Sequence, residues 1–241
     1  MELTLETIRA AHARIAPYIV QTPLLRLPAL DDALGCEVYA KAECMQRTGA
    51  FKLRGAYNKI RSLTKEEADR GVIACSAGNH AQGIALSATK LGIKSIICMP
   101  AGAPISKVEA TKNYGAEVVL VPGVYDDAAR EADRLAKEHG YTFAHPFNDP
   151  YVMAGQGTIG LEILDQLPDV DAVIVPVGGG GLISGVAFAI KSLKPDVKVY
   201  GVQAEGAPSM YRSLHEHKYQ TLQAASTFAD GIQVKTPGEL T

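Results

Sequence analysis

Residues 72–99 read VIACSAGNHAQGIALSATKLGIKSIICM, and the pattern of this stretch decides the fold. An apolar run, Val72 to Cys75, is followed by a helical stretch near 79–91 and by a second apolar run, Ser95 to Met99. Each run has the length of a strand that is buried on both faces. Two such strands joined by a helix predict parallel strands with a right-handed crossover.

The same alternation extends in both directions from this unit. Further strands are expected at 117–121, 172–175 and 198–202, and further helices near 104–114, 125–139, 155–167, 182–194 and 207–217. Toward the N-terminus the pattern predicts a helix from Leu5 to Ile15, capped by Thr4 and closed by Pro17, then a strand at 38–42 and a helix at 51–63. The fold class is therefore α/β, with a doubly wound parallel sheet.

The best internal boundary is the segment His145 to Pro150, because its prolines interrupt the alternation. We expect a small lobe at 48–146. Residues 1–47 and 147–241 would together form a large lobe.

Composition narrows the function classes. The chain has 241 residues, a hydrophobic content of 47% and a formal net charge of -2, without a basic stripe that would favour nucleic acid or a membrane surface. The four cysteines, Cys36, Cys44, Cys75 and Cys98, lack metal-ligand spacing and are expected to be reduced thiols. The first residues do not resemble a signal peptide, and no apolar run has the length of a membrane span. We expect a soluble, cytoplasmic protein.

Lys52 is the strongest candidate for chemistry. It follows an aromatic residue, Phe51, behind a Thr48-Gly49 turn and at the start of a predicted helix. Most lysines are solvated surface cations. A lysine at this position can instead be desolvated, which lowers its pKa and allows its amine to attack a carbonyl group.

Four consecutive glycines, Gly178 to Gly181, lie between a buried strand and a helix beginning near Leu182. Such a loop lets backbone amides converge on a phosphate at a helix N-terminus. The spacing of a dinucleotide fingerprint and the Gly-Lys-Ser/Thr ending of a nucleotide loop are both absent, so a small monophosphate is expected. The alternative is a flexible turn.

The segment Ser76 to Gly83 also joins a strand to a helix. Ser76 and the amides after it could hold a carboxylate, and the Asn79 amide could bond a ring hydroxyl, although plain helix capping explains both residues equally well. For His80 we favour a structural role, with its ring donating to backbone. Cys75 is expected to be a small buried apolar residue.

Five stretches together resemble the threonine dehydratases, or threonine ammonia-lyases, among the fold-type-II pyridoxal-phosphate enzymes. They are Gln46–Ala56, Ser76–Gly83, Ala154–Thr158, Gly178–Leu182 and Ala229–Ile232, in family order. The resemblance runs from residue 4 to residue 241. It implies a two-lobed fold like that of the tryptophan synthase β chain.

The resemblance also implies residue roles. Lys52 would carry pyridoxal 5'-phosphate and, once released, take the α-proton of the substrate, with Phe51 beside it. Asn79 would contact the pyridine hydroxyl, and Gly178, Gly179, Gly180, Gly181 and Leu182 would hold the phosphate. Ser76, Ala77, Gly78, Asn79 and His80 would bind the substrate carboxylate. The reaction would convert L-threonine or L-serine into a 2-oxo acid and ammonia, in a homodimer or homotetramer.

Three departures from the family pattern bear on function. Ala50 replaces the usual serine, a small change that should leave Lys52 in place. Ala77 stands where the related serine racemases have a serine that serves as their second base, which favours elimination. Glu205 matches one acid of a racemase cation site, but Tyr211 takes the place of the other, so we expect no metal.

Family members continue past residue 241, and their further residues supply the partner of the pyridine nitrogen. We therefore expect an incomplete large lobe. Two alternatives to a dehydratase remain open: an enzyme of the same fold, such as a serine racemase or a β-replacing synthase, and a catalytically impaired fragment that binds cofactor or pairs with a partner chain. The choice between threonine and serine, and between a biosynthetic and a catabolic role, is open as well.

Overall fold

The computed structural model describes residues 1–241. Its α-helices are α1 Leu5–Ile15, α2 Pro28–Leu34, α3 Lys52–Arg61, α4 Lys65–Arg70, α5 Asn79–Lys90, α6 Ile105–Asn113, α7 Tyr125–His139, α8 Pro150–Gln166, α9 Gly181–Leu193 and α10 Ser209–His215. Its strands are β1 Leu24–Arg26, β2 Tyr39–Lys41, β3 Val72–Cys75, β4 Ser95–Pro100, β5 Glu117–Val121, β6 Thr142–Phe143, β7 Ala172–Pro176 and β8 Lys198–Val202. Two short 3₁₀ helices are η1 Glu43–Met45 and η2 Asp230–Ile232.

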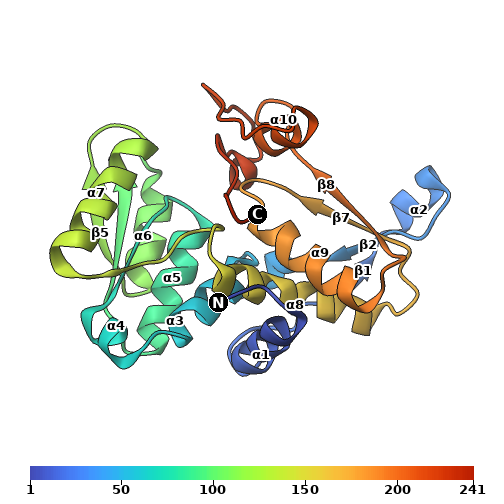
Figure 1. The fold of residues 1–241 in the computed structure, drawn as a ribbon, viewed down its shortest axis with the longest axis horizontal. Coiled ribbons are helices and arrows are strands. Elements are labelled where there is room, and N and C mark those ends of the chain that lie inside the picture. Colours follow the sequence, from blue (N-terminus) through green and yellow to red (C-terminus); the bar gives the residue numbers. More distant parts are fainter.

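Figure 1 shows two lobes. The four-stranded sheet with α4, α5, α6 and α7 forms one, and β7, β8, α9 and α10 belong to the other. Helices α3 and α8 pack against each other where the lobes meet. The residue boundaries of 48 and 146 stay a prediction.

The four-stranded sheet confirms the predicted doubly wound arrangement. All its pairs are parallel, its order is β5-β4-β3-β6, and β3 pairs with β4 in the register Val72↔Ser95. The chain thus builds outward from β3 through β4 to β5 and returns to the other side of β3 as β6. Such a reversal leaves a crevice at the carboxyl ends of the two strands on either side of it, here β3 and β6.

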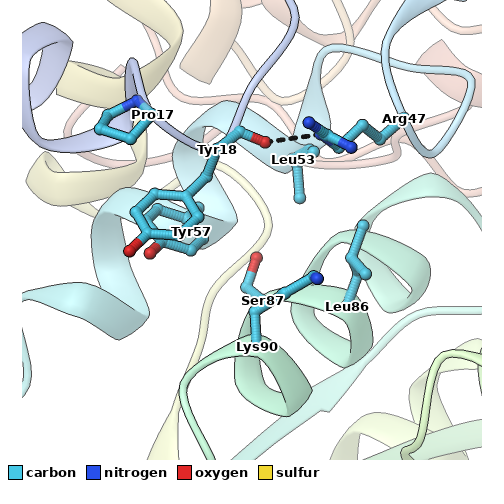
Figure 2. A pocket seen from close by; sticks show the side chains of 8 residues that line it. All are labelled: Pro17, Tyr18, Arg47, Leu53, Tyr57, Leu86, Ser87 and Lys90. Atoms are coloured by element: carbon cyan, nitrogen blue, oxygen red, sulfur yellow. Dashed lines mark hydrogen bonds between the residues drawn. The ribbon is translucent and has the colours of Figure 1, made fainter.

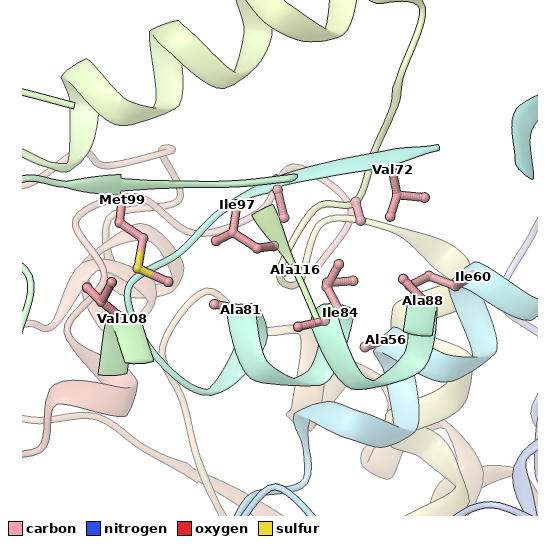
Figure 3. Close-up of a cluster of buried hydrophobic side chains, with 13 residues drawn as sticks. Ala56, Ile60, Val72, Ala81, Ile84, Ala88, Ile97, Met99, Val108 and Ala116 are labelled. Atoms are coloured by element: carbon pink, nitrogen blue, oxygen red, sulfur yellow. The ribbon is translucent and has the colours of Figure 1, made fainter. Parts of the chain in front are cut away.

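Alternate residues of the strands supply two apolar layers. Ala74 and Ile97 face α5 and α3, in the core cluster that Figure 3 shows. Ile73, Cys98 and their neighbours pack on the other face against Ala128 and Ala132 of α7. Helices on both faces explain why these strands read as continuous apolar runs.

Several local predictions are confirmed and others need correction. Helix α1 has the predicted bounds, with the Thr4 side chain accepting from Thr7 N. Strand β2 lies where a strand was expected and pairs antiparallel with β1, a strand that was not predicted because it has only three residues between two prolines. Helix α8 begins at Pro150, five residues earlier than expected, because the Asp149 carboxylate caps it. Strands β7 and β8 form a separate two-stranded parallel sheet.

No helix combines the length and the apolarity that crossing a bilayer requires.

Candidate functional site

The crevice of the four-stranded sheet lies between two segments that leave β3 and β6. The Ser76–His80 segment follows β3, and the Ala144–Asn148 segment follows β6. The His80 ring joins them, because its Nε2 lies 2.9 Å from the carbonyl oxygen of Ala144. The predicted structural role for His80, donation to backbone, is confirmed.

The other nitrogen of this ring has no partner. A carbonyl oxygen only accepts, so the proton of neutral His80 lies on Nε2 and Nδ1 carries a free lone pair. His80 is buried, and Nδ1 contacts no donor. Burial and the nearby Lys52 cation lower the pKa of His80 to about 3, which keeps the ring neutral at pH 7.

Lys52 is the first residue of α3, after a turn in which Gly49 has a φ of 70°. Its Nζ donates to the carbonyl oxygen of Pro146 at 2.9 Å and lies 5.4 Å from the centre of the Phe51 ring. Desolvation lowers the pKa of the Lys52 amine to about 8. The lysine therefore has the lowered pKa expected from its sequence position, and more of its amine is unprotonated near neutral pH than in a solvated lysine.

Close helix packing holds Lys52 beside the Ser76–His80 segment. A Cβ on Gly83 of α5 would lie 3.4 Å from the carbonyl carbon of Lys52. The contact between α3 and α8 is tighter, because a Cβ on Gly155 of α8 would lie 2.6 Å from the backbone of Gly55 in α3. Glycines at these crossings let α3 approach both α5 and α8 closely.

The predicted carboxylate loop is open at its tip. The Ser76 hydroxyl accepts from Gly78 N at 3.2 Å, and the Asn79 side chain is exposed and makes no hydrogen bond. The N–H groups of Ala77, Asn79 and His80 donate to nothing in the chain. Cys75, just before the loop, is buried as expected, and burial raises the pKa of its thiol to about 12.

The glycine loop offers a row of free donors. The backbone N–H groups from Gly178 to Ile183 make no hydrogen bond within the chain, whereas the carbonyls of Gly178 and Gly180 each accept one and that of Gly179 accepts two. Gly180 has a φ of 97° and precedes the first turn of α9, so the partial positive charge of the helix adds to these donors. This arrangement suits an anion with several oxygens.

The glycine loop has no room for side chains, because Phe147 and Thr241 lie against it. A Cβ on Gly179 would overlap the ring of Phe147, and one on Gly181 would lie 2.8 Å from the Phe147 backbone. A Cβ on Gly180 would lie 2.5 Å from Thr241 Oγ1, which donates to the carbonyl of Gly179.

The segment His145–Asn148 connects Lys52 to the glycine loop, a role that its sequence pattern did not predict. Pro146 accepts from Lys52, and Phe147 packs on Gly179. His145 Nδ1 accepts from Phe147 N and Asn148 N at 3.3 and 2.8 Å, which shapes the turn. The two prolines marked the segment only as a boundary.

The structure thus links the predicted segments through the residues after β6, since Ala144 contacts His80, Pro146 contacts Lys52 and Phe147 packs on Gly179. Phe51 and Leu182 both pack on the apolar cluster that contains Val175 and Val186, so they share one wall. A desolvated amine and a row of free amide donors fit a group that carries both a carbonyl and a phosphate. No three side chains of His, Cys, Asp or Glu come together as metal ligands.

The cavity in Figure 2 is separate from the predicted site residues. It has a volume of about 170 Å³ and is lined from α3, α5 and the segments around Tyr18 and Arg47. None of its lining residues is a predicted site residue. The two stacked tyrosines, Tyr18 and Tyr57, fill one side of it.

Comparison with known proteins agrees with this geometry. A family model described as pyridoxal-phosphate dependent enzyme matches residues 15–241. An L-threonine ammonia-lyase of Thermotoga maritima is 53% identical over 239 residues, which cover 99% of this chain and 60% of that protein. The catabolic L-threonine dehydratase TdcB of Escherichia coli is 48% identical, with 100% of this chain and 73% of the relative covered.

Solved structures give the same fold. A serine racemase of maize has a TM-score of 0.97 at 40% identity, with 100% of this chain and 73% of the other covered. The processed threonine deaminase isoform 2 of Solanum lycopersicum has a TM-score of 0.95 at 43% identity, with 100% and 68% covered. The chain therefore spans about 60 to 73% of the length of these relatives.

Proposed function

Because the chain belongs to the family of pyridoxal-phosphate-dependent enzymes, we propose that it is a threonine dehydratase that also accepts L-serine. The reaction eliminates water across the Cα–Cβ bond of L-threonine, and the released enamine is hydrolysed to 2-oxobutanoate and ammonia. L-Serine gives pyruvate in the same way. The threonine ammonia-lyase and dehydratase relatives, at 53% and 48% identity, support this substrate class.

The observation that carries the proposal is the Lys52 amine, with a pKa of about 8 and a hydrogen bond to Pro146. Bound pyridoxal phosphate would supply a covalent attachment point for an amine and an electron sink for the electrons left at the substrate Cα. Lys52 would attach the cofactor and, after the substrate amine displaces it, take the proton from Cα. Both tasks need the neutral amine, which desolvation favours.

The remaining residues would bind and orient. The free N–H groups from Gly178 to Leu182 would hold the phosphate, and Asn79 would contact the ring hydroxyl. The segment Ser76 to His80 would hold the substrate carboxylate at the N-terminus of α5, through the Ser76 hydroxyl and the free N–H groups of Ala77, Asn79 and His80, with Gly78 leaving open space beside them. Phe51 and the half-buried Phe147 would limit the access of water to the amine.

Two linked measurements test the proposal. The chain with added pyridoxal phosphate is reduced with borohydride and mapped by mass spectrometry, and a cofactor label on Lys52 is expected. A 2-oxo-acid assay with L-threonine follows. Lys52→Ala should lose both signals, with Lys65→Ala as the matched control because the Lys65 side chain is 85% exposed. A label that persists in Lys52→Ala would refute the assignment.

A serine racemase is the second candidate, because the maize racemase has the same fold and 40% identity. Ala77 argues against it. Its methyl side chain cannot accept a proton, so a second base on the opposite face of the substrate is missing at this position. Chiral chromatography of serine decides between the two, since racemisation faster than pyruvate release would favour the racemase.

We further propose that the chain associates with itself. Apolar side chains of β7 and β8 are exposed, with exposed fractions of 70% for Ile174, 51% for Tyr200 and 51% for Val202. An apolar patch of this kind favours burial against protein. Sedimentation equilibrium is expected to show a dimer or tetramer, and a monomer at all concentrations would contradict the proposal. A cytoplasmic location stays a prediction.

A further inference from the structure

A group of charged side chains lies in the interior next to the Lys52 turn. Arg54 is fully buried and faces two carboxylates. Its Nη1 and Nη2 lie 2.6 and 2.9 Å from the carboxylate oxygens of Glu162, and its Nε and Nη2 lie 2.9 and 2.8 Å from those of Glu43. Lys41 Nζ donates to the second oxygen of Glu162 at 2.6 Å. We call Arg54, Glu162, Glu43 and Lys41 the buried ion network.

The network is electrically balanced, with two cations and two carboxylates. Burial alone would lower the pKa of Arg54, but the bonds from Glu162 and Glu43 raise it above its ordinary value. Burial likewise opposes ionisation of Glu162, but Arg54 and Lys41 hold its pKa below the usual range. Arg54 and Glu162 are therefore held in their charged forms, and each of the four side chains contacts a side chain of opposite sign.

The members come from four elements, and only Glu162 lies far from the other three in the sequence. Arg54 belongs to α3, Glu162 to α8, Glu43 to η1 and Lys41 to β2. The Arg54–Glu162 contact spans 108 residues of sequence. At the other end of α3, Lys59 pairs with Asp149, the N-cap of α8, at 2.7 Å. Helix α3 is thus tied to α8 at both ends.

Lys52 depends on both of these elements. Its backbone begins α3, two residues before Arg54, and the acceptor of its amine, Pro146, lies just before α8. A shift of α3 along α8 would change the distance between the amine and this carbonyl. The guanidinium of Arg54 bonds two carboxylates at fixed angles, so it resists such a shift.

Stability alone does not account for the network. Replacing a buried ion pair with apolar residues of similar volume is often neutral or stabilising, because desolvation offsets much of the attraction. Apolar packing could hold α3 and α8 together, but it does not set their relative position as sharply as bidentate hydrogen bonds do.

We propose that Arg54 is a positioning residue, which Glu162 and Glu43 hold in place so that the first turn of α3 keeps the Lys52 amine against Pro146 and away from water. The inference rests on the proposed role of Lys52. It predicts that a change at Arg54 alters the titration of the lysine even where the fold survives.

Two histidines lie close enough to Lys52 for its charge to affect their pKa values. His80 of α5 and His145 before α8 both stand near Lys52, and burial lowers the pKa of His145 to about 4. Both rings are therefore neutral above pH 6. A titration seen between pH 7 and pH 10 belongs to the amine.

The test uses the cofactor-free chain and a limiting amount of an amine-acylating reagent at a series of pH values. Mass spectrometry of the peptide that contains Lys52 gives the midpoint of its reactivity, expected near pH 8. Arg54→Lys keeps the charge but loses the planar fork, and we expect the midpoint to rise by about one pH unit toward that of an ordinary lysine. Because a rise of one pH unit leaves about one tenth as much unprotonated amine at pH 7, the borohydride-trapped cofactor label on Lys52 should fall about tenfold.

Controls separate positioning from folding. Arg61→Lys changes an exposed arginine of the same helix and should leave the midpoint unchanged. Urea unfolding shows which variants fold, and the charge-neutral double variant Arg54→Met with Glu162→Met serves if Arg54→Lys does not. An unaltered midpoint in a folded variant would overturn the proposal, as would the failure of both variants to fold, which would assign the network to folding alone. If Arg54→Lys raises the midpoint as expected but the unaltered chain carries no cofactor label on Lys52, the proposed function is refuted and the positioning role is not.

Discussion

Replacing Lys52 with methionine is expected to stabilise the cofactor-free chain, because folding removes the charged Lys52 amine from water at a cost in free energy. Desolvation lowers the pKa of this amine from 10.5 to about 8. A cation whose folded pKa is lowered destabilises the folded state wherever the amine is protonated in the unfolded chain. Methionine keeps the length of the side chain without the charge.

The size of the effect follows from the pKa difference. A difference of about 2.5 units at about 1.4 kcal/mol per unit corresponds to roughly 3 kcal/mol at pH 7. The sign is set by proton binding, since the unfolded chain binds more protons than the folded chain between pH 8 and pH 10.5. The penalty is complete below pH 8, falls to about 1 kcal/mol at pH 10 and disappears above the unfolded pKa.

Urea unfolding of the cofactor-free chain and of Lys52→Met, at pH 7 and at pH 10, measures this difference. Comparing the two proteins at each pH cancels the other groups that titrate in this range. Lys65→Met is the matched control, because its side chain is 85% exposed and its free energy of unfolding should change by less than about 0.5 kcal/mol.

Two results would refute the reasoning. A Lys52→Met chain less stable than the unaltered one at pH 7 would show that the lysine is not desolvated at a cost. A gain that is equal at pH 7 and pH 10 would show that it comes from packing and not from the buried charge.

Three further predictions concern the crevice and the contact between the lobes. Gly179→Val is expected to weaken the affinity for pyridoxal phosphate by ~2–4 kcal/mol, because overlap with the Phe147 ring would displace the free N–H groups of the loop. Titration with the cofactor measures this affinity, and an unchanged value in a folded variant would mean that the loop is only a turn. Ala77→Ser restores a hydroxyl in the carboxylate loop, so chiral chromatography should detect slow serine racemisation that the unaltered chain lacks. The Lys107–Asp230 pair joins α6 to η2 at 2.5 Å with both side chains partly or largely exposed. Lys107→Met should therefore lower the free energy of unfolding by no more than about 1 kcal/mol, and a larger loss in urea would show that this contact holds the lobes together.

Much of the fold was predictable because its signals are local. A strand buried on both faces needs a continuous apolar run, and a helix that covers it needs apolar residues at helical spacing, so Val72–Cys75 and the stretch after it were legible in the sequence alone. The short strand β1 was not, because three residues carry too little periodicity. The antiparallel pairing of β2 depends on β1, so it was missed with it.

The sequence by itself determined the strand–helix alternation, the glycines that leave the loop free of side chains, and Lys52 as the candidate nucleophile, since each depends on residue type and near neighbours. Only the tertiary structure decided what surrounds that lysine. Its acceptor, Pro146, is 94 residues away, and the Arg54–Glu162 contact spans 108 residues. Burial, and with it the pKa of an amine, is set by segments that meet only when the chain folds, so no local pattern could place Arg54 in the interior or Phe147 against Gly179.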